Sequence, residues 1–242
     1  MAGKATASGP RRPARAHAFV ADLDSPELDP ADRHHLERVL RLRAGDEITV
    51  SDGRGGWRAC RLGPVLEPTG AVARDARPSP EITVAFAPVK GERPEWAVQK
   101  LTELGVDRIV PFAADRSVVR WDGERAARQA ERLRRVAREA AMQCRRTWLP
   151  DVEEVAGFDE VAGRPGAVLA DRDGGPPSLP AGPVLVGPEG GWSPEEVALD
   201  LPRMALGDHV LRAETAAVAV AALLGALRAG LVAPAADEFR RA

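Results

Sequence analysis

The stretch "VLVGPEGGWSPEE", residues 184–196, predicts a strand, a loop and a helix in immediate succession. The run Val184–Val186 has the apolar composition of a buried strand. Ser193 followed by Pro194 and two glutamates is typical of a helix start, with an N-cap, a proline in the first turn and acids near the positive end of the helix dipole. Open α/β sheets bind ligands at the carboxyl ends of their strands, so we predict that residues 187–192 form a ligand-binding loop.

The composition indicates a globular protein without a global basic field. The 242 residues include 44% hydrophobic and 29% charged residues, and the net charge is −2. No uncharged apolar run reaches the roughly 18–20 residues that span a bilayer, so no membrane segment is expected. Cys60 and Cys144 lack metal-ligand spacing and are expected to be buried free thiols, which fits a reducing cytoplasm.

The chain divides into an arm and two domains. Residues 1–16 contain four basic residues and no apolar signal core, so they are predicted to be a mobile basic N-terminal arm. Residues 17–75 contain short strand-like runs, a helical turn near residues 29–42 and glycine pairs that suit a hairpin at 52–56, which predicts a small β unit. The proline-containing segment 73–80 marks the boundary.

From residue 76 to 242, strand-like and helical segments alternate. Strands are expected at 82–87, 108–112, 167–170, 184–186 and 204–206, and helices at 94–104, 123–145 and 215–229. This alternation predicts an α/β fold, with a mostly parallel sheet and helices on both faces.

Two glycine-containing loops are the candidate site. The first is 187–192, and the second is "LGDHVLRAETAA", residues 206–217. Both expose backbone groups where they turn, which suits a planar heterocycle held by main-chain hydrogen bonds. The sequence has no phosphate-binding loop, no dinucleotide fingerprint and no nucleophile elbow, and its four histidines lack zinc spacing, so no metal is expected.

Four ordered motifs carry a resemblance to a known family. They are "KGERPEWAVQKLTELGVDRIVPF", "AAMQCRRTWLPDVEEV", "LVGPEGGWSPEEV" and "LGDHVLRAETAAVAVAALL". Together they resemble the bacterial 16S ribosomal RNA uracil-N3 methyltransferases of the SPOUT class. The segment "RHHLERVLRLRAGDEITVSDGRG" also resembles that family's N-terminal PUA-like RNA-binding β-barrel, so the likeness covers nearly the whole chain.

The resemblance implies a fold and a cofactor. It places a trefoil-knotted sheet in residues 76–242, in which the knot presses the two loops together and forms a cleft for S-adenosylmethionine. Trp192 departs from the aliphatic residue more common in the family at that position. The implied cofactor-binding residues are Gly187, Pro188, Glu189, Gly190, Gly191, Leu206, Gly207, Val210, Leu211, Arg212 and Thr215.

The implied reaction is methylation of N3 of a specific uridine in 16S ribosomal RNA. A uracil N3–H is weakly acidic, so catalysis must remove its proton or stabilise the resulting anion. Arg212 and Glu214 are the catalytic candidates. Arg212 would stabilise the anion, and Glu214 would either orient Arg212 or accept the proton; the alternative is an ordinary ion pair that caps the last helix.

A basic cluster on the predicted barrel and further basic residues near the ends of the motifs are the RNA-binding candidates, because phosphate contacts position an RNA. They are Arg33, His34, His35, Arg38, Arg41, Arg43, Lys90, Lys100, Arg116, Arg145 and Arg146. The implied partner is 16S ribosomal RNA in the small ribosomal subunit. The resemblance also implies a cytoplasmic homodimer, with which the alanine-rich segment 215–229 is compatible.

Two alternatives stay open at this level. One is a knotted methyltransferase with another acceptor, either a ribose 2′-hydroxyl or guanine N1. The other is an RNA-binding relative without catalytic activity. Neither the proton acceptor nor the target nucleotide follows from the residue chemistry.

Overall fold

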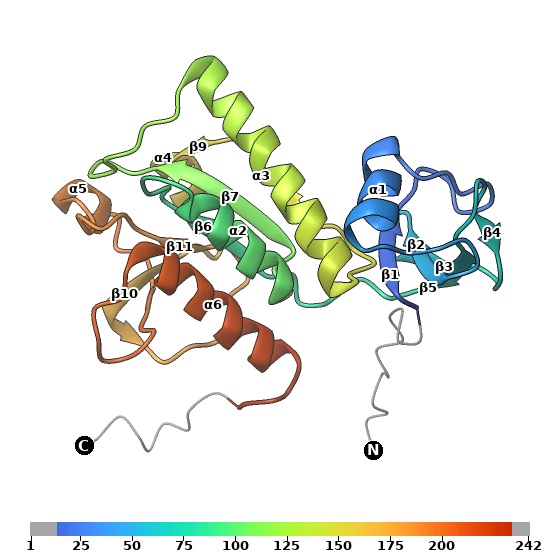
Figure 1. Cartoon of the computed structure of the whole chain (residues 1–242). Coiled ribbons are helices and arrows are strands. Elements are labelled where there is room, and N and C mark those ends of the chain that lie inside the picture. The colour runs from blue at the N-terminus through green and yellow to red at the C-terminus, as the bar shows by residue number, and fades with distance from the viewer. Residues whose placement is uncertain (1–13, 234–242) are drawn as a thin grey trace. The chain divides into compact units, whose positions relative to one another are not determined.

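A computed structural model describes residues 14–233, which form two compact units (Figure 1). The first unit comprises the chain up to Arg77 together with Arg138–Leu149, and the second comprises Pro78–Ala137 and the chain from Pro150 onward. Helix α3, Gly123–Cys144, therefore begins in the second unit and contributes its last residues to the first. The division at Arg77 falls inside the segment 73–80 expected to be the boundary.

The first unit contains a five-stranded sheet. Its strands are β1 (Ala16–Phe19), β2 (Glu47–Ser51), β3 (Gly56–Arg61), β4 (Glu67–Pro68) and β5 (Ala73–Arg74). The order is β1-β2-β3-β4, with β5 also paired to β3; β1 runs parallel to β2 and the other pairs are antiparallel. Asp52 Oδ1 accepts from the backbone N–H groups of Arg54 and Gly56 at 2.7 and 2.9 Å and closes the predicted hairpin.

The helical turn predicted near residues 29–42 is present, but half of it has unusual geometry. Helix α1 (Pro30–His34) is capped by Asp29, whose carboxylate accepts from Ala31 N at 2.8 Å. It continues as a π-helix, η1 (His35–Val39). Periodicity cannot predict this change, because five residues make about one turn, which is too short to reveal a hydrophobic period different from that of an α-helix.

The segment Arg138–Leu149 joins the first unit through both polar and apolar contacts. Arg138 Nη1 donates to Asp32 Oδ1 at 2.8 Å, and Thr147 O accepts from Ser51 Oγ at 3.0 Å. Ala141 and Met142 are buried in the same core as Leu36. The sequence prediction had assigned this segment to the second domain.

The second unit is built on a seven-stranded sheet. Its strands are β6 (Thr83–Phe86), β7 (Arg108–Ala113), β8 (Asp151–Val152), β9 (Ala156–Gly157), β10 (Val168–Gly175), β11 (Val184–Val186) and β12 (Arg203–Met204). The order is β12-β10-β11-β6-β7-β8, with β9 also paired to β7, and every pair is parallel. The mostly parallel sheet is therefore confirmed, and β11 has the predicted bounds.

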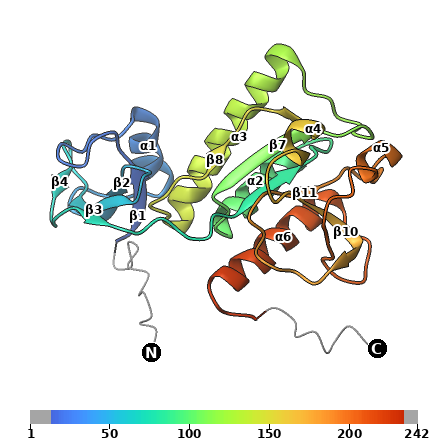
Figure 2. The same ribbon diagram turned by 180° about the vertical axis from the view of Figure 1, so that it is seen from behind.

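Helices cover both faces of this sheet. On one face, α2 (Arg93–Glu103) and α6 (Ala213–Arg228) pack against each other, and α3 adds Leu133 and Ala137 to their core (Figure 1). The opposite face carries α4 (Phe158–Ala162), which lies over β7 and β9 (Figure 2). The short helix α5 (Pro194–Val197) follows the loop after β11.

Some sequence predictions concern residues outside 14–233, and others need correction. Residues 1–13 of the predicted arm lie outside the described residues, whereas Ala14 and Ala16 are buried and Arg15 N donates to Glu47 O at 2.7 Å, so the sheet begins inside the predicted arm. Strand β10 extends five residues beyond the predicted end at Ala170. Cys60 is a buried free thiol as predicted, whereas Cys144 is only half-buried. The trefoil knot stays a prediction.

The buried His17 of β1 makes the stability of the first unit depend on pH. His17 is 2% exposed, its Nδ1 lies 2.8 Å from Thr49 Oγ1, and burial lowers its pKa from 6.5 to about 4, with the positive charge of Arg145 acting in the same direction. The native state thus keeps the imidazole neutral where the unfolded chain protonates it. The contribution of His17 to the free energy of unfolding is fully present above pH 6.5 and is lost as the pH falls toward 4.

We predict that His17→Gln removes this dependence. Relative to the variant, the wild-type chain should lose about 2 kcal/mol of unfolding free energy between pH 7 and pH 5. Urea denaturation of both proteins at the two pH values measures the difference. Parallel pH profiles for the two proteins would contradict the prediction.

Candidate functional site

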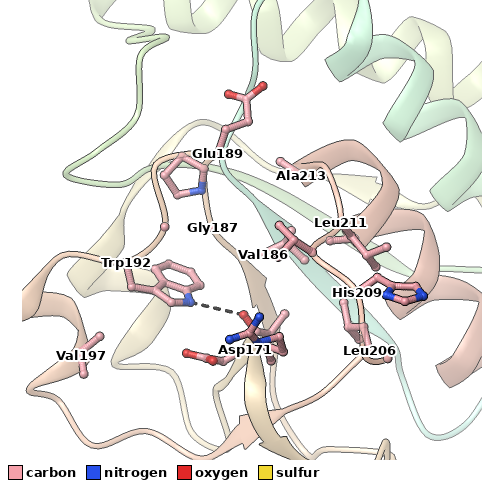
Figure 3. A pocket seen from close by; sticks show the side chains of 17 residues that line it. Asp171, Val186, Gly187, Glu189, Trp192, Val197, Leu206, His209, Leu211 and Ala213 are labelled. Carbon is pink, nitrogen blue, oxygen red and sulfur yellow. Dashed lines mark hydrogen bonds between the residues drawn. The ribbon is translucent and has the colours of Figure 1, made fainter.

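The two predicted loops line one cavity of about 400 Å³ at the carboxyl end of β11, beside residues 170–172 in the middle of β10 (Figure 3). Trp192 lies on one side of it, and Leu206, His209 and Leu211 lie on the other. The lining residues are Ala170, Asp171, Arg172, Val186, Gly187, Pro188, Glu189, Gly191, Trp192, Val197, Leu206, Gly207, His209, Val210, Leu211, Ala213 and Ala216. The end of β11 therefore meets a mainly apolar, loop-walled cavity, as the opening sequence predicts.

The first loop turns tightly directly after β11. Gly191 N donates to Pro188 O at 2.9 Å, and Gly191 has a φ of 71°, a backbone conformation that favours glycine. A Cβ on Gly187 would lie 3.1 Å from the Trp192 ring. The glycines therefore let the loop fold back on its own tryptophan and leave its backbone at the cavity.

Trp192 fixes one wall of the cavity. Its Nε1 donates to Ala170 O at 3.3 Å, and its ring stacks on Phe112 with centroids 6.3 Å apart and planes 12° apart (Figure 3). Sequence reasoning noted only that Trp192 differs from the family pattern. Its indole ties the loop to β10, so the difference adds a hydrogen bond and leaves the loop glycines in place.

The helix start predicted at Ser193 is confirmed and anchors the end of this loop. Ser193 and Glu196 form a capping box, in which Ser193 N donates to Glu196 Oε2 at 2.8 Å and Glu196 N donates to Ser193 Oγ at 3.1 Å. Asp115 closes the network, because its N–H donates to Glu196 Oε1 at 2.9 Å and its carboxylate accepts from Ser193 Oγ at 2.7 Å. The loop is thus held at both ends.

The second loop, between β12 and α6, is more open. Val210 is 84% exposed, although it lines the cavity. Three predicted cofactor residues, Gly190, Arg212 and Thr215, do not line the cavity, whereas the other eight do. Arg212 occupies the N-cap position of α6, is exposed, and forms no ion pair within residues 14–233.

Glu214 contacts an arginine that sequence reasoning did not select. Its Oε1 lies 3.7 Å from Arg93 Nε, and Arg93 Nη1 donates to Glu189 Oε1 at 3.1 Å. Arg93, in the first turn of α2, thus links the first loop to the start of α6. Glu214 is 11% exposed, and its Oε2 is buried without a hydrogen-bond partner in the described part of the chain. The Arg212–Glu214 ion pair, which was the alternative to catalytic roles for these residues, is not formed within residues 14–233.

Arg93 lies in the motif "KGERPEW" that carries the family likeness, but sequence reasoning assigned it no role. A contact between residues 93 and 214 leaves no local signal in the sequence. Asp171 and Arg172, which also line the cavity, were missed because the strand was expected to end at Ala170. His209 was noted only as one of four histidines.

Eight of the predicted RNA-binding residues lie in the first unit. His34, His35, Arg38, Arg41 and Arg43 are exposed on or after α1 and η1. Arg33 instead holds the neighbouring loop, since its Nη1 donates to Gly63 O at 2.8 Å. Arg145 and Arg146 are half-buried, and Arg146 Nε donates to Trp148 O at 3.1 Å.

The other three lie in the second unit. Lys90 is exposed, and Lys100 pairs with Glu103 at 2.9 Å. Arg116 Nη1 donates to Gly190 O of the first loop at 3.2 Å. Arg116 therefore lies against the loop that walls the cavity.

The cavity suits a nucleoside-bearing cofactor. Its volume falls within the roughly 300–1,000 Å³ of small-molecule sites, and its lining combines apolar side chains with exposed backbone at glycine turns. Within residues 14–233, no three His, Cys, Asp or Glu side chains gather so that they could hold a metal ion. No helix in the same range is long and apolar enough to cross a membrane.

Family models match both units. The model described as an RNA methyltransferase domain matches residues 77–225, and that of an RNA methyltransferase PUA domain matches residues 28–64. The chain is 34% identical over 229 residues to the ribosomal RNA small subunit methyltransferase E of Synechocystis, covering 83% of this chain and 72% of the relative. The enzyme of the same name from Bacillus subtilis is 32% identical, with coverages of 76% and 82%.

Solved structures agree with this assignment. A putative methyltransferase from Legionella pneumophila, solved with bound S-adenosylmethionine, superposes with a TM-score of 0.76 at 26% identity, over 87% of this chain and 96% of that chain. A ribosomal RNA small subunit methyltransferase E from Neisseria gonorrhoeae bound to S-adenosylmethionine gives 0.70 at 27% identity, over 88% and 97%. The chain belongs to the SPOUT-class RNA methyltransferase family that includes the ribosomal RNA small subunit methyltransferases E.

Proposed function

We propose that the protein methylates N3 of a specific uridine in 16S ribosomal RNA, with S-adenosylmethionine as methyl donor. The observation that carries this proposal is the cavity in which both glycine-containing loops meet, at the carboxyl end of β11 and beside residues 170–172 of β10. Relatives named for the small-subunit RNA, and solved relatives with S-adenosylmethionine bound, support the choice of substrate and donor.

The donor would be held by the first and second loops. The apolar side chains of Val186, Leu206 and Leu211 would contact its adenine, and backbone groups at Gly187 and Gly207 would provide hydrogen bonds. When bound, S-adenosylmethionine supplies a methyl group activated by its sulfonium. Gly190 and Thr215, which lie outside the cavity lining, stay predicted cofactor residues, whereas Arg212, also outside the lining, is assigned to the acceptor instead.

Arg212 is the proposed stabiliser of the acceptor. Its exposed guanidinium lies at the last position of the second loop before α6 and is not neutralised by an ion pair in the described chain, so it is free to meet the uracil oxygen or the N3 anion. A base inside folded RNA must be swung out, which costs roughly a few kcal/mol that phosphate contacts can offset.

Glu214 has a positioning role through Arg93. Its carboxylate contacts Arg93 and does not line the cavity, and Arg93 also holds Glu189 of the first loop. The two acids therefore share one cation that ties the start of α6 to the first loop. These contacts favour a positioning role through Arg93 over both predicted roles of Glu214, orientation of Arg212 and acceptance of the N3 proton.

The proposed partner is 16S ribosomal RNA in the small subunit, which places the activity in the cytoplasm. The family likeness implies a homodimer, and α6 offers the exposed Ala222 and half-buried Leu223 for helix packing. Light scattering of the purified chain, whose mass is 25.8 kDa, tests for the dimer.

The function is tested with purified protein, tritiated S-adenosylmethionine and small ribosomal subunits from a strain that lacks the gene. We expect one methyl group per subunit, located by mass spectrometry on N3 of a single uridine. Subunits from the parent strain are the control and should accept none. A methyl group on a ribose 2′-hydroxyl or on guanine N1 would refute uracil N3 as the acceptor. Absence of methyl transfer would refute the proposed methyltransferase activity.

Substitution Arg212→Ala should abolish turnover and leave donor binding intact. Loss of one preorganised cation beside a developing anion lowers kcat by roughly 10²–10³-fold. Calorimetry with S-adenosylmethionine should show an unchanged Kd, because the side chain lies outside the cavity lining. Retained turnover would remove Arg212 from the mechanism.

Substitution Glu214→Gln separates positioning from proton acceptance, with Glu189→Gln as the matched control on the same arginine. Loss of either ion pair to Arg93 should weaken donor binding by up to about fivefold, since such pairs contribute up to about 1 kcal/mol, and should change kcat little. If Glu214→Gln alone lowered kcat by roughly 10²–10⁴-fold, Glu214 would be the proton acceptor instead.

A further inference from the structure

Helix α3 has a row of solvent-exposed arginines that are not part of the candidate site. Its inward side is buried, with Ala130, Leu133 and Ala137 less than 3% exposed. The row consists of exposed residues that recur every three or four positions in the part of α3 belonging to the second unit. We call this set the arginine stripe: Arg125, Arg128, Arg132 and Arg135.

The spacing turns these residues into a straight line of charge. Steps of three, four and three residues keep side chains on one side of an α-helix. At a rise of about 1.5 Å per residue, the stripe extends for about 15 Å along a rigid element. A line of cations on a helix is a suitable match for consecutive phosphates of one nucleic-acid strand.

Neighbouring acids leave the stripe mostly available. Arg125 and Arg135 form no ion pair within residues 14–233, and Arg128 pairs with Glu124 at 3.1 Å while staying 70% exposed. Arg132 contacts Glu95 through Nε at 2.9 Å, and its side chain stays 49% exposed. Since a guanidinium carries five N–H donors, each of the four can still make forked contacts to an anion.

The stripe also connects to the candidate site within the same unit. The segment between β7 and α3 passes beside α5 (Figure 1), where Asp115 bonds to the Ser193–Glu196 capping box. This segment carries two further exposed arginines, Arg116 and Arg120. Arg116 donates to Gly190 O of the first loop, so basic residues continue from the cavity rim to the start of the stripe.

We propose that the arginine stripe is an RNA-binding surface that holds the phosphate backbone of the substrate strand leading away from the target nucleotide. The chain has a net charge of −2, so this concentration of positive charge is local. Arginine side chains, a rigid support and a direct connection to the site favour RNA over an acidic protein as the partner. The inference rests on the proposed function, because it names where that substrate is held.

The test is a binding measurement without methyl donor. Fluorescence anisotropy with transcribed 16S ribosomal RNA, over a series of salt concentrations, compares the wild-type chain with Arg128→Gln/Arg135→Gln. Glutamine has a helix propensity close to that of arginine, so α3 should persist, and thermal unfolding verifies this. We expect roughly tenfold weaker binding at 0.1 M salt and a slope of log Kd against log salt shallower by about 1.4–1.8.

Glu124→Gln is the matched control on the same helix. It removes the acid that pairs with Arg128 and so should tighten RNA binding, a change of opposite sign that loss of structure cannot produce. Unchanged affinity and slope in the double variant would overturn the proposal. So would a double variant that binds naked RNA normally and fails only on intact subunits, because the partner would then be a ribosomal protein.

The outcomes separate this inference from the proposed function. If the slope becomes shallower but no methyl transfer is found, the stripe binds RNA and the proposed reaction is wrong. If transfer occurs and the double variant keeps both wild-type slope and wild-type turnover, the reaction stands and the stripe has no part in it.

Discussion

The second unit depends on the burial of its central strands from both sides. In β6, Val84 and Phe86 enter the core under α2 and α6, while Ala85 enters the core under α4. In β11, Val184 and Val186 face the first core and Leu185 the second. A parallel sheet packed in this way has no open face, and fully burying each such side chain is worth about 1.5–3 kcal/mol. A ligand can therefore reach the central strands β6 and β11 only at their ends.

Close backbone contacts then fix the position of β10 relative to its neighbours in the sheet. A Cβ on Gly174 in β10 would lie 2.5 Å from Met204 N in β12, and a Cβ on Gly182 would lie 2.2 Å from Pro165 O. Neither position can accept a side chain without displacing backbone, so the segments on both sides of β10 are held at a single distance. The sheet forms the floor of the cavity, and the two loops form its walls. The first loop is held by the hydrogen bond of Trp192 and by the Ser193 cap, whereas the second loop leaves Val210 exposed.

The local features of this site could be predicted from the sequence, and the long-range ones could not. Val184–Val186 and the helix start at Ser193 were predicted because apolar runs, N-caps and prolines act over a few residues. Strands β8 and β9 were missed because two residues carry no periodicity. The helix at 123–145 was predicted as one element of the second domain, but not that Ala141 packs in a different core from Ala137. Arg93 was found only from its distance to Glu189 and Glu214.

The arginines of the second unit illustrate why residue type alone does not give a role. Arg93 and Arg128 are both partly exposed residues near the start of a helix. Arg93 lies between two acids from separate segments, so its charge is used inside the fold and joins those segments. Arg128 meets one acid of its own helix, an i,i+4 contact worth only about 0.3–0.5 kcal/mol, which a phosphate can readily replace. The acids around each guanidinium therefore distinguish an arginine that shapes the donor cavity from one that can bind RNA.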